Sequence, residues 1–379
     1  MKFARPITRR TMLASSAGAA ATLAFAPSLI AAQEAAPEGL DAIAKRKGLR
    51  FGSAIDARDI EDPAIVALLR KDCSILVAEN AFKWKQVERF ARDYDLERAD
   101  AIYEFANANE MALRGHTLAW NQDDRIPEWM VRVEDEPEAV RGPIVQLLIE
   151  QHVEMMARRY PGISSWDAVN EMVLLRDGSI RSSVLSRALG ERIMDVTFHK
   201  AREMMPDCQL AYNDYMTWNT NPHHRRGVLE LLESSLARGV PIDALGIQGH
   251  LVNTAAGDVD ERSWREFLDE VRGMGLKVLI TELDCADTDL SETSIAARDQ
   301  AAADHVKAFL DVTLSYDNVT DVLLWDMTDR ESYVRSPRYA DRRPRADGAV
   351  LRAHPYDDNL QPKPMYGAIA AALRAAPER

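Results

Sequence analysis

The chain has 379 residues, of which 46% are hydrophobic and 28% are charged, and its formal net charge at pH 7 is −13. This composition suffices for one large core and excludes a chain that is disordered over most of its length. The first 32 residues contribute four positive charges to that total, so the remainder carries −17. Such an acidic body repels phosphate backbones, which argues against nucleic acid as a partner.

Residues 1–32 have the features of an export signal. A basic start is followed by an apolar stretch over 12–30 and by small residues up to Ala32. The pair Arg9 and Arg10 resembles a twin-arginine signal, which carries folded proteins across a bacterial inner membrane. A membrane anchor is the alternative, but the stretch is alanine-rich and weakly hydrophobic. We expect cleavage near Ala32, export to the periplasm or beyond, and no membrane segment in the mature protein.

Eight short apolar runs alternate with amphipathic segments after the signal. They lie at residues 49–55, 74–79, 112–120, 164–171, 209–215, 244–251, 277–284 and 319–325. Eight strand and helix units predict an α/β protein, a (β/α)8 TIM barrel, with one catalytic domain over residues 33–379. A doubly wound open sheet would alternate similarly, but the sequence after Gly52 lacks its glycine-rich phosphate loop.

Two of the predicted strands, the fourth and the seventh, deliver a glutamate at or near their ends, Glu171 and Glu282. Active sites of such barrels lie at the C-terminal ends of the strands, so we expect the two carboxyl groups to face each other. Glycoside hydrolysis needs this pair, because one carboxyl protonates the leaving oxygen and the other attacks the sugar or activates water.

Most of the other predicted strands end in polar or aromatic residues at the same rim. These residues are Glu79, Asn80, Lys83, His116, Trp120, Tyr215, Gln248, His250 and Trp325. Taken singly, each is better explained as an ordinary core or surface residue. Their recurrence at successive strand ends favours a sugar-binding lining, because amides, histidines and tryptophans suit hydroxyl groups and apolar ring faces.

The cysteines and histidines indicate neither a disulfide scaffold nor a metal centre. Cys73, Cys208 and Cys285 are widely spaced, and we expect them to be buried free thiols. The eight histidines form no H-x-H or H-E-x-x-H pattern, which disfavours a metal-dependent barrel hydrolase. We expect no metal and no cofactor.

Six segments, in chain order, resemble those of family 10 glycoside hydrolases, the retaining endo-1,4-β-xylanases. They are ENAFK at 79–83, HTLAW at 116–120, WDAVNE at 166–171, NDY at 213–215, QGH at 248–250 and ITELD at 280–284. The likeness extends from about Gly52 to Tyr366. It implies a retaining enzyme that hydrolyses xylan and xylo-oligosaccharides without a cofactor.

The resemblance also implies roles for individual residues. Glu171 matches the family's general acid/base and Glu282 its nucleophile. His250 matches a histidine that binds the nucleophile and Asn170 an asparagine that contacts the sugar 2-hydroxyl, while Asp284 could orient His250. The set implied to bind sugar on the non-reducing side is Glu79, Asn80, Lys83, His116, Trp120, Gln248 and Trp325, and Tyr215 is implied to stack on the leaving-group side.

Three positions depart from the family pattern. Asn121 follows Trp120 where the family usually has histidine, and Asp326 follows Trp325 where it usually has glycine. Tyr333 stands where the family usually has tryptophan, which keeps an aromatic face for substrate and adds a hydroxyl group. These departures affect the lining of the expected cleft.

The segment from Arg335 to Arg352 is unusually basic, with further arginines at 338, 342, 343 and 345. We expect a solvated surface loop, and a sharper hypothesis is that some of these arginines bind glucuronic acid decorations on xylan.

Alternative functions are a β-1,4-glucanase or another retaining glycosidase of the same clan, or a non-catalytic carbohydrate-binding relative. A monomer is expected, because the sequence has neither long heptads nor a large apolar patch.

Overall fold

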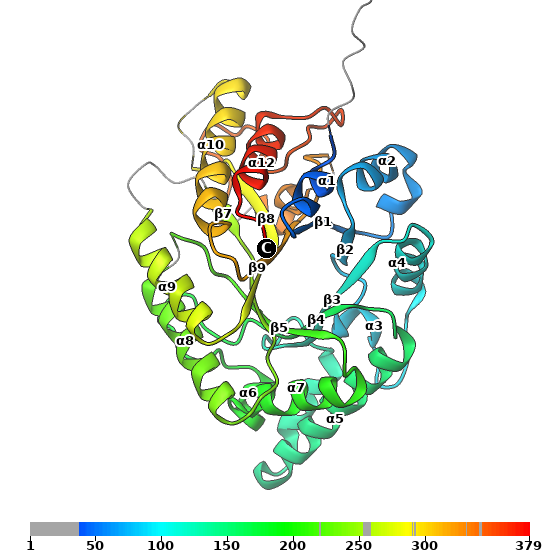
Figure 1. The fold of residues 1–379 in the computed structure, drawn as a ribbon. Helices are drawn as coiled ribbons and strands as arrows, with labels where there is room; N and C mark the ends of the chain where they lie inside the picture. The colour runs from blue at the N-terminus through cyan, green and yellow to red at the C-terminus, as the bar shows by residue number, and fades with distance from the viewer. Residues whose placement is uncertain are drawn as a thin grey trace, which may run out of the picture. The chain divides into compact units, whose positions relative to one another are not determined.

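Eight parallel strands close into a barrel in this computed structural model, as predicted (Figure 1). Around the ring they are β1 (Arg50–Ile55), β2 (Ile75–Ala78), β3 (Ala112–Trp120), β4 (Ser165–Asn170), β5 (Gln209–Asp214), β6 (Ala244–Ile247), β8 (Lys277–Ala286) and β9 (Val319–Leu324). Pairing of β6 with β8 and of β9 with β1 completes the ring. The strands are almost entirely buried, because helices cover the outside and side chains fill the inside.

The structure describes residues 38–219, 221–252, 259–289, 291, 293–330, 332–340 and 343–379. The predicted export signal at 1–32, the first residues of the expected catalytic domain, and Arg342 lie outside this set. Residues Glu38–Arg379 form one unit, which is the barrel. No helix in the described ranges is both long enough and apolar enough to cross a membrane.

The sixth predicted strand, 244–251, is wrong as a single element. It is β6 followed by a separate short strand, β7 (His250–Val252), which pairs with the C-terminal part of β8. Gly249 breaks the run with a φ of +74°, a conformation that glycine adopts without a steric penalty. The break places His250 opposite Asp284 in the β7–β8 pairing.

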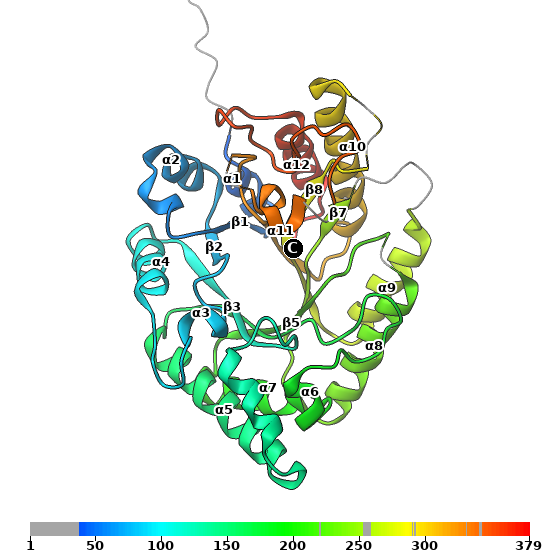
Figure 2. The same ribbon diagram turned by 180° about the vertical axis from the view of Figure 1, so that it is seen from behind.

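Helices surround the barrel wall (Figures 1 and 2). They are α1 (Leu40–Lys45), α2 (Pro63–Asp72), α3 (Trp84–Val87), α4 (Glu97–Ala108), α5 (Glu138–Arg159), α6 (Val184–Leu189), α7 (Arg192–Met204), α8 (Pro222–Ala237), α9 (Glu261–Gly273), α10 (Ile295–Thr313), α11 (Pro337–Ala340) and α12 (Pro364–Ala375). Local sequence sets several starts: Asp62 caps α2 ahead of Pro63, and Ser183 and Ser186 form a capping box at α6.

Charged side chains also pair inside the barrel, below its rim. Arg114 on β3 makes a two-pronged ion pair with Asp167 on β4, and both side chains are only 1% exposed. The same carboxylate contacts Nδ1 of His116 at 2.8 Å. Cys73, Cys208 and Cys285 are buried free thiols, as predicted. The interior ion pair therefore supports His116 from below the rim.

Candidate active site

Glu282, on β8, is held at both carboxylate oxygens. Asn213 Nδ2 donates to Oε1 over 2.8 Å, and Nε2 of His250 lies 3.0 Å from Oε2. Nδ1 of His250 lies 2.6 Å from Asp284 Oδ2, so one imidazole joins the two acidic groups. The predicted orientation of His250 by Asp284 is confirmed.

The carboxylates around His250 determine its charge. Burial alone would lower the pKa of His250, but Asp284 and Glu282 outweigh burial and raise that pKa to about 10. Burial alone would raise the pKa of Glu282, but the hydrogen bond from His250 and nearby positive charge hold it below its usual range. Glu282 is therefore ionised beside an imidazolium near neutral pH.

Glu171 occupies a different environment, directly after β4. Its backbone has a φ of +56°, which is uncommon for a residue with a side chain and is often found at functional sites. Gln248 Nε2 donates to its Oε1 over 3.1 Å, and Arg181 Nη2 lies 3.8 Å from its Oε2. Burial and the charge of Asp214 raise the pKa of Glu171, although Gln248 and Arg181 oppose them. This glutamate is thus biased toward its protonated form.

Gln248 and Asn213 connect the two glutamates through their side chains and backbones. Gln248 donates to Glu171 through its side-chain amide, and its backbone carbonyl oxygen accepts the Glu282 N–H at 2.9 Å. Asn213 Nδ2 donates both to Glu282 and, over 2.9 Å, to Asn170 Oδ1. Glu171 and Glu282 therefore belong to one site at the C-terminal rim, as predicted.

The aromatic and basic residues predicted to bind sugar form a second part of the same site. Lys83 Nζ donates to Asn80 Oδ1 over 3.0 Å and lies 5.1 Å from the centre of the Trp120 ring and 5.7 Å from that of Trp325. The ring of His116 meets both tryptophan rings edge-on, with centroids 5.5 and 5.3 Å away. Trp325 in turn meets the His250 ring at 6.4 Å, which joins this cluster to the nucleophile side.

Lys83 is buried and Glu79 is partly buried, and each charge offsets the effect of burial on the other residue. Burial lowers the pKa of Lys83 to about 8, although the charge of Glu79 opposes this shift. Burial raises the pKa of Glu79, and Lys83 opposes that shift. Glu79 and Lys83 therefore interact electrostatically beside Trp120 and Trp325.

Several buried polar atoms of the site have no hydrogen-bond partner among the described residues. They include His116 Nε2, Asn170 Nδ2 and Gln248 Oε1, all from residues singled out in the sequence. Leaving a buried polar group unpaired costs about 1–3 kcal/mol, so such atoms rarely gather without a reason. A ligand with many hydroxyl groups would supply the missing partners.

Tyr215 and Tyr333 interact with different parts of the two-glutamate centre. Burial and the charge of Glu171 raise the pKa of Tyr215, which directly follows β5. Tyr333 instead contacts the His250 ring, with centroids 5.5 Å apart, and donates its hydroxyl to Asp284 over 2.9 Å. Tyr333 is therefore part of the Glu282 surroundings.

Sequence reasoning missed three contributors to the site. Asn213 was noted only within the segment NDY at 213–215. Its side chain joins Asn170 on β4 to Glu282 on β8, and these contacts depend on how the strands are arranged. Arg181, in the loop after β4, gave no periodic or motif signal, yet it lies beside Glu171. Asp167 is inside a recognised motif, but its support of His116 needed the register of β3 against β4.

The basic segment after Tyr333 is a largely exposed loop, as expected, but three of its arginines are tied down by ion pairs. Arg345 is buried and pairs with Asp347 at 2.9 Å, and it lies 3.8 Å from Asp287. Arg352 pairs with Asp299 at 2.7 Å, and Arg335 pairs with an aspartate of the following segment. These three guanidinium groups are neutralised by the protein's own carboxylates, which removes them as receptors for acidic sugar decorations.

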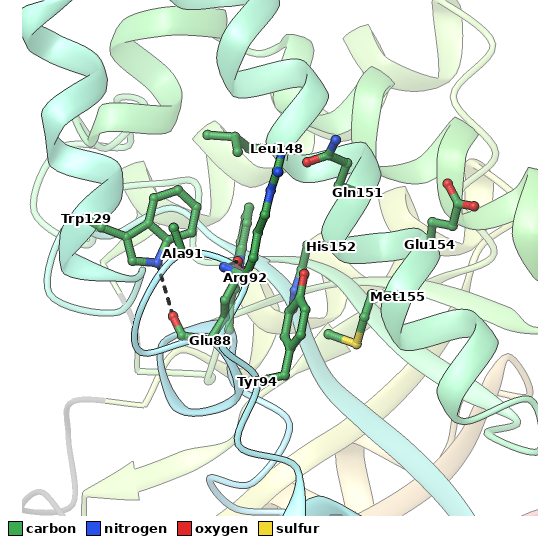
Figure 3. Close-up of a pocket in the computed structure, with 11 residues that line it drawn as sticks. Glu88, Ala91, Arg92, Tyr94, Trp129, Leu148, Gln151, His152, Glu154 and Met155 are labelled. Carbon is green, nitrogen blue, oxygen red and sulfur yellow. Dashed lines mark hydrogen bonds between the residues drawn. The ribbon is translucent and has the colours of Figure 1, made fainter.

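A cavity of about 430 Å³ lies on the outer wall, between α5 and the chain that follows α3 (Figure 3). Its lining includes Tyr94, Trp129 and His152, and none of the predicted site residues. A shallower depression of about 480 Å³ includes Arg181 and so adjoins Glu171. In the described part of the chain, no group of three or more His, Cys, Asp or Glu side chains could hold a metal ion.

Two proteins with similar sequences are both named endo-1,4-beta-xylanases. The chain is 28% identical to endo-1,4-beta-xylanase 3 of Hypocrea jecorina, over 89% of this chain and 87% of that protein. It is 30% identical to endo-1,4-beta-xylanase 5 of Pyricularia oryzae, over 89% of this chain and 79% of that protein.

Two solved xylanase structures have a similar fold. Xylanase B from Clostridium stercorarium F9 superposes with a TM-score of 0.77 at 28% identity, covering 88% of this chain and 99% of that one. Xylanase 10B from Thermotoga petrophila RKU-1, solved in complex with xylobiose, gives 0.77 at 25% identity, covering 89% and 98%. The sequence pattern of glycosyl hydrolase family 10 matches residues 39–372, and the chain belongs to that family.

Proposed function

We propose that the protein is a retaining endo-1,4-β-xylanase in which Glu171 is the general acid/base and Glu282 the nucleophile. The observation that carries the proposal is that the pKa values of two neighbouring glutamates are shifted in opposite directions. Glu282 is kept ionised beside His250, and burial raises the pKa of Glu171. This division of protonation states is what a two-carboxylate glycosidase requires.

In the first step, the Glu282 carboxylate attacks the anomeric carbon while the Glu171 carboxylic acid protonates the departing glycosidic oxygen. The product is a glycosyl ester on Glu282 with inverted configuration. Asn213 supports the attack by holding Oε1, and His250 holds Oε2. Asn170 offers an unpartnered amide nitrogen that can donate to the sugar 2-hydroxyl, a bond that strengthens in the transition state.

In the second step, water attacks the anomeric carbon and gives a proton to Glu171, which now acts as a base, while the bond between that carbon and the Glu282 oxygen breaks and frees the carboxylate. The second inversion restores the original configuration, so retention follows. The exchange of roles is favoured because Glu282 loses its negative charge when it is esterified, which lowers the pKa of Glu171. His250 remains to stabilise Glu282 as a leaving group when the ester is cleaved.

Xylan is the proposed substrate because the relatives are named xylanases and one was solved with xylobiose. The site suits a neutral polysaccharide, since Trp120 and Trp325 offer apolar faces among polar groups that lack partners. Recognition of a neutral sugar does not depend on the net charge of −13.

Turnover tests both the activity and the substrate. The mature domain should release short xylo-oligosaccharides from beechwood xylan far faster than it releases products from carboxymethyl cellulose, and Glu282→Ala should abolish both. Preferred cleavage of the cellulose would favour a β-1,4-glucanase. Retained binding of xylohexaose without turnover by the unaltered protein would indicate a non-catalytic relative.

Export by the twin-arginine route is proposed on the sequence of residues 1–32. Replacing both Arg9 and Arg10 by lysine should leave the precursor in the cytoplasm of a bacterial host, whereas the unaltered chain should be processed and exported. Equal export of the two forms would contradict the proposed route.

A further inference from the structure

The hydroxyl group of Tyr333 is directed at the acidic end of the hydrogen-bond chain that holds Glu282. It donates to Asp284 Oδ2 over 2.9 Å and lies 3.1 Å from Nδ1 of His250. A phenol has one hydrogen to donate, and the carboxylate receives it because Nδ1 of an imidazolium is itself a donor. Tyr333 therefore acts on the two groups that orient the nucleophile.

One oxygen of Asp284 accepts both donors. Nδ1 of His250 lies 2.6 Å from Oδ2, and Nε2 of the same ring lies 3.0 Å from Glu282. Asp284 is only 2% exposed, so water does not readily replace a lost donor. Removing the phenolic hydroxyl should let Asp284 shift, and the imidazole that it orients should move with it.

Asp326 fixes the backbone that carries Tyr333. Its carboxylate accepts the Tyr333 N–H over 3.1 Å, at the start of the short helical turn Tyr333–Arg335. Asp326 is buried and has a φ of +88°, a conformation that is sterically unfavourable for a residue with a side chain. Glycine, the usual family residue, would avoid this cost but would offer no carboxylate.

We propose that Asp326 and Tyr333 form one positioning unit for the nucleophile: Asp326 holds the backbone of Tyr333, and the Tyr333 hydroxyl holds Asp284 and through it His250. The inference rests on the proposed function, in which Glu282 attacks the sugar. The two departures from the family pattern are thereby explained as parts of a single connection.

Other charged or titratable groups face this connection and remain present when Tyr333 is changed. Those that interact with Glu282 are His116, His250, Lys83, Arg114, Asp167 and Tyr215. Those that interact with Asp284 include Tyr339, Asp326 and His354. Because these groups stay in place in Tyr333→Phe, a changed pH profile of that variant reports the loss of the Tyr333 hydroxyl.

Three substitutions test the unit in the full mature chain. Tyr333→Phe removes the hydroxyl, Tyr333→Trp restores the usual family ring without it, and Asp326→Gly relieves the backbone strain while removing the anchor. The control is Tyr339→Phe, the same change in a ring that packs edge-on against Tyr333 with centroids 5.5 Å apart. The readouts are kcat, KM and the acid limb of kcat/KM on xylohexaose.

Tyr333→Phe should lower kcat about tenfold, as expected for one hydrogen bond to a charged group, with little change in KM. The acid limb should move up by about half to one pH unit, because Glu282 is less well held in its ionised form. Tyr333→Trp should shift the limb similarly, and Tyr339→Phe should not. Asp326→Gly combined with Tyr333→Phe should add little to Tyr333→Phe alone, because both act through one path.

A second readout does not depend on turnover. Nitrogen-15 NMR of the His250 ring, assigned with His250→Gln, should show a changed titration in Tyr333→Phe and an unchanged one in Tyr339→Phe. An unshifted acid limb and an unshifted His250 titration in Tyr333→Phe, or additive effects of the two substitutions, would overturn the positioning unit. Failure of the proposed function would instead appear as no xylohexaose turnover by the unaltered protein, and the His250 titration would still decide the inference.

Discussion

Replacing His250 by glutamine should raise the pH at which the enzyme loses activity in acid. The imidazolium donates to Glu282 over 3.0 Å and also binds Asp284, so its removal leaves two buried carboxylates without their shared cation. A hydrogen bond between charged groups contributes about 1.5–3 kcal/mol. Since one pKa unit corresponds to about 1.4 kcal/mol, the pKa of Glu282 should rise by about one to two units.

The sign follows from the role of Glu282. The nucleophile must be ionised, so a higher pKa means that a higher pH is needed for the same active fraction, and the acid limb of kcat/KM moves upward. The hydrogen bond from Asn213 to the other oxygen remains, so ionisation is weakened and not abolished. Glutamine is chosen because it keeps a polar side chain of similar length without the charge.

The assay is the pH profile of kcat/KM on an aryl xylobioside, whose good leaving group reduces the dependence on Glu171. His199→Gln is the matched control, because His199 is exposed on α7 and belongs to no part of the site. An acid limb in His250→Gln that coincides with that of the unaltered enzyme, in a protein that remains folded, would refute the account of Glu282 ionisation.

Three further outcomes are expected. Glu171→Ala should lower xylan turnover by about 10²–10⁴-fold and lower the first step on a dinitrophenyl xylobioside much less, because that leaving group needs no acid; equal losses would contradict the acid role. Asn213→Ala should lower kcat on xylohexaose about 10- to 100-fold with little change in KM, since it removes a donor to Glu282, and a change confined to KM would count against this. Arg114→Met should lower the free energy of unfolding in urea by about 3–5 kcal/mol, because Asp167 is left buried without its cation, and an unchanged denaturation midpoint would disprove that cost.

The barrel and its two glutamates could be predicted from the sequence because both depend on local signals. Apolar runs of strand length mark the strands, and the residue type at the end of each run marks the rim. Glu171 and Glu282 lie where this pattern predicts, one residue beyond β4 and within β8. Parallel strands closed into a ring leave little freedom in which side chains meet at the rim.

The details that the sequence did not reveal depend on long-range contacts. The basic segment was predicted to be solvated because two of its partners, Asp287 for Arg345 and Asp299 for Arg352, lie in other segments of the chain. The division of β6 from β7 was hidden because Gly249 lies inside an otherwise continuous run, and only its φ of +74° ends the strand. Interactions across strands thus determine the fine structure of the site.

The central claim is that Glu282 attacks the sugar and that configuration is retained. Proton NMR of the first products from xylohexaose measures it directly, with Glu282→Ala as the control. The account predicts that β-configured xylo-oligosaccharides form first, mutarotate later, and are absent with Glu282→Ala. Products that are initially α-configured, or unchanged turnover by Glu282→Ala, would contradict it.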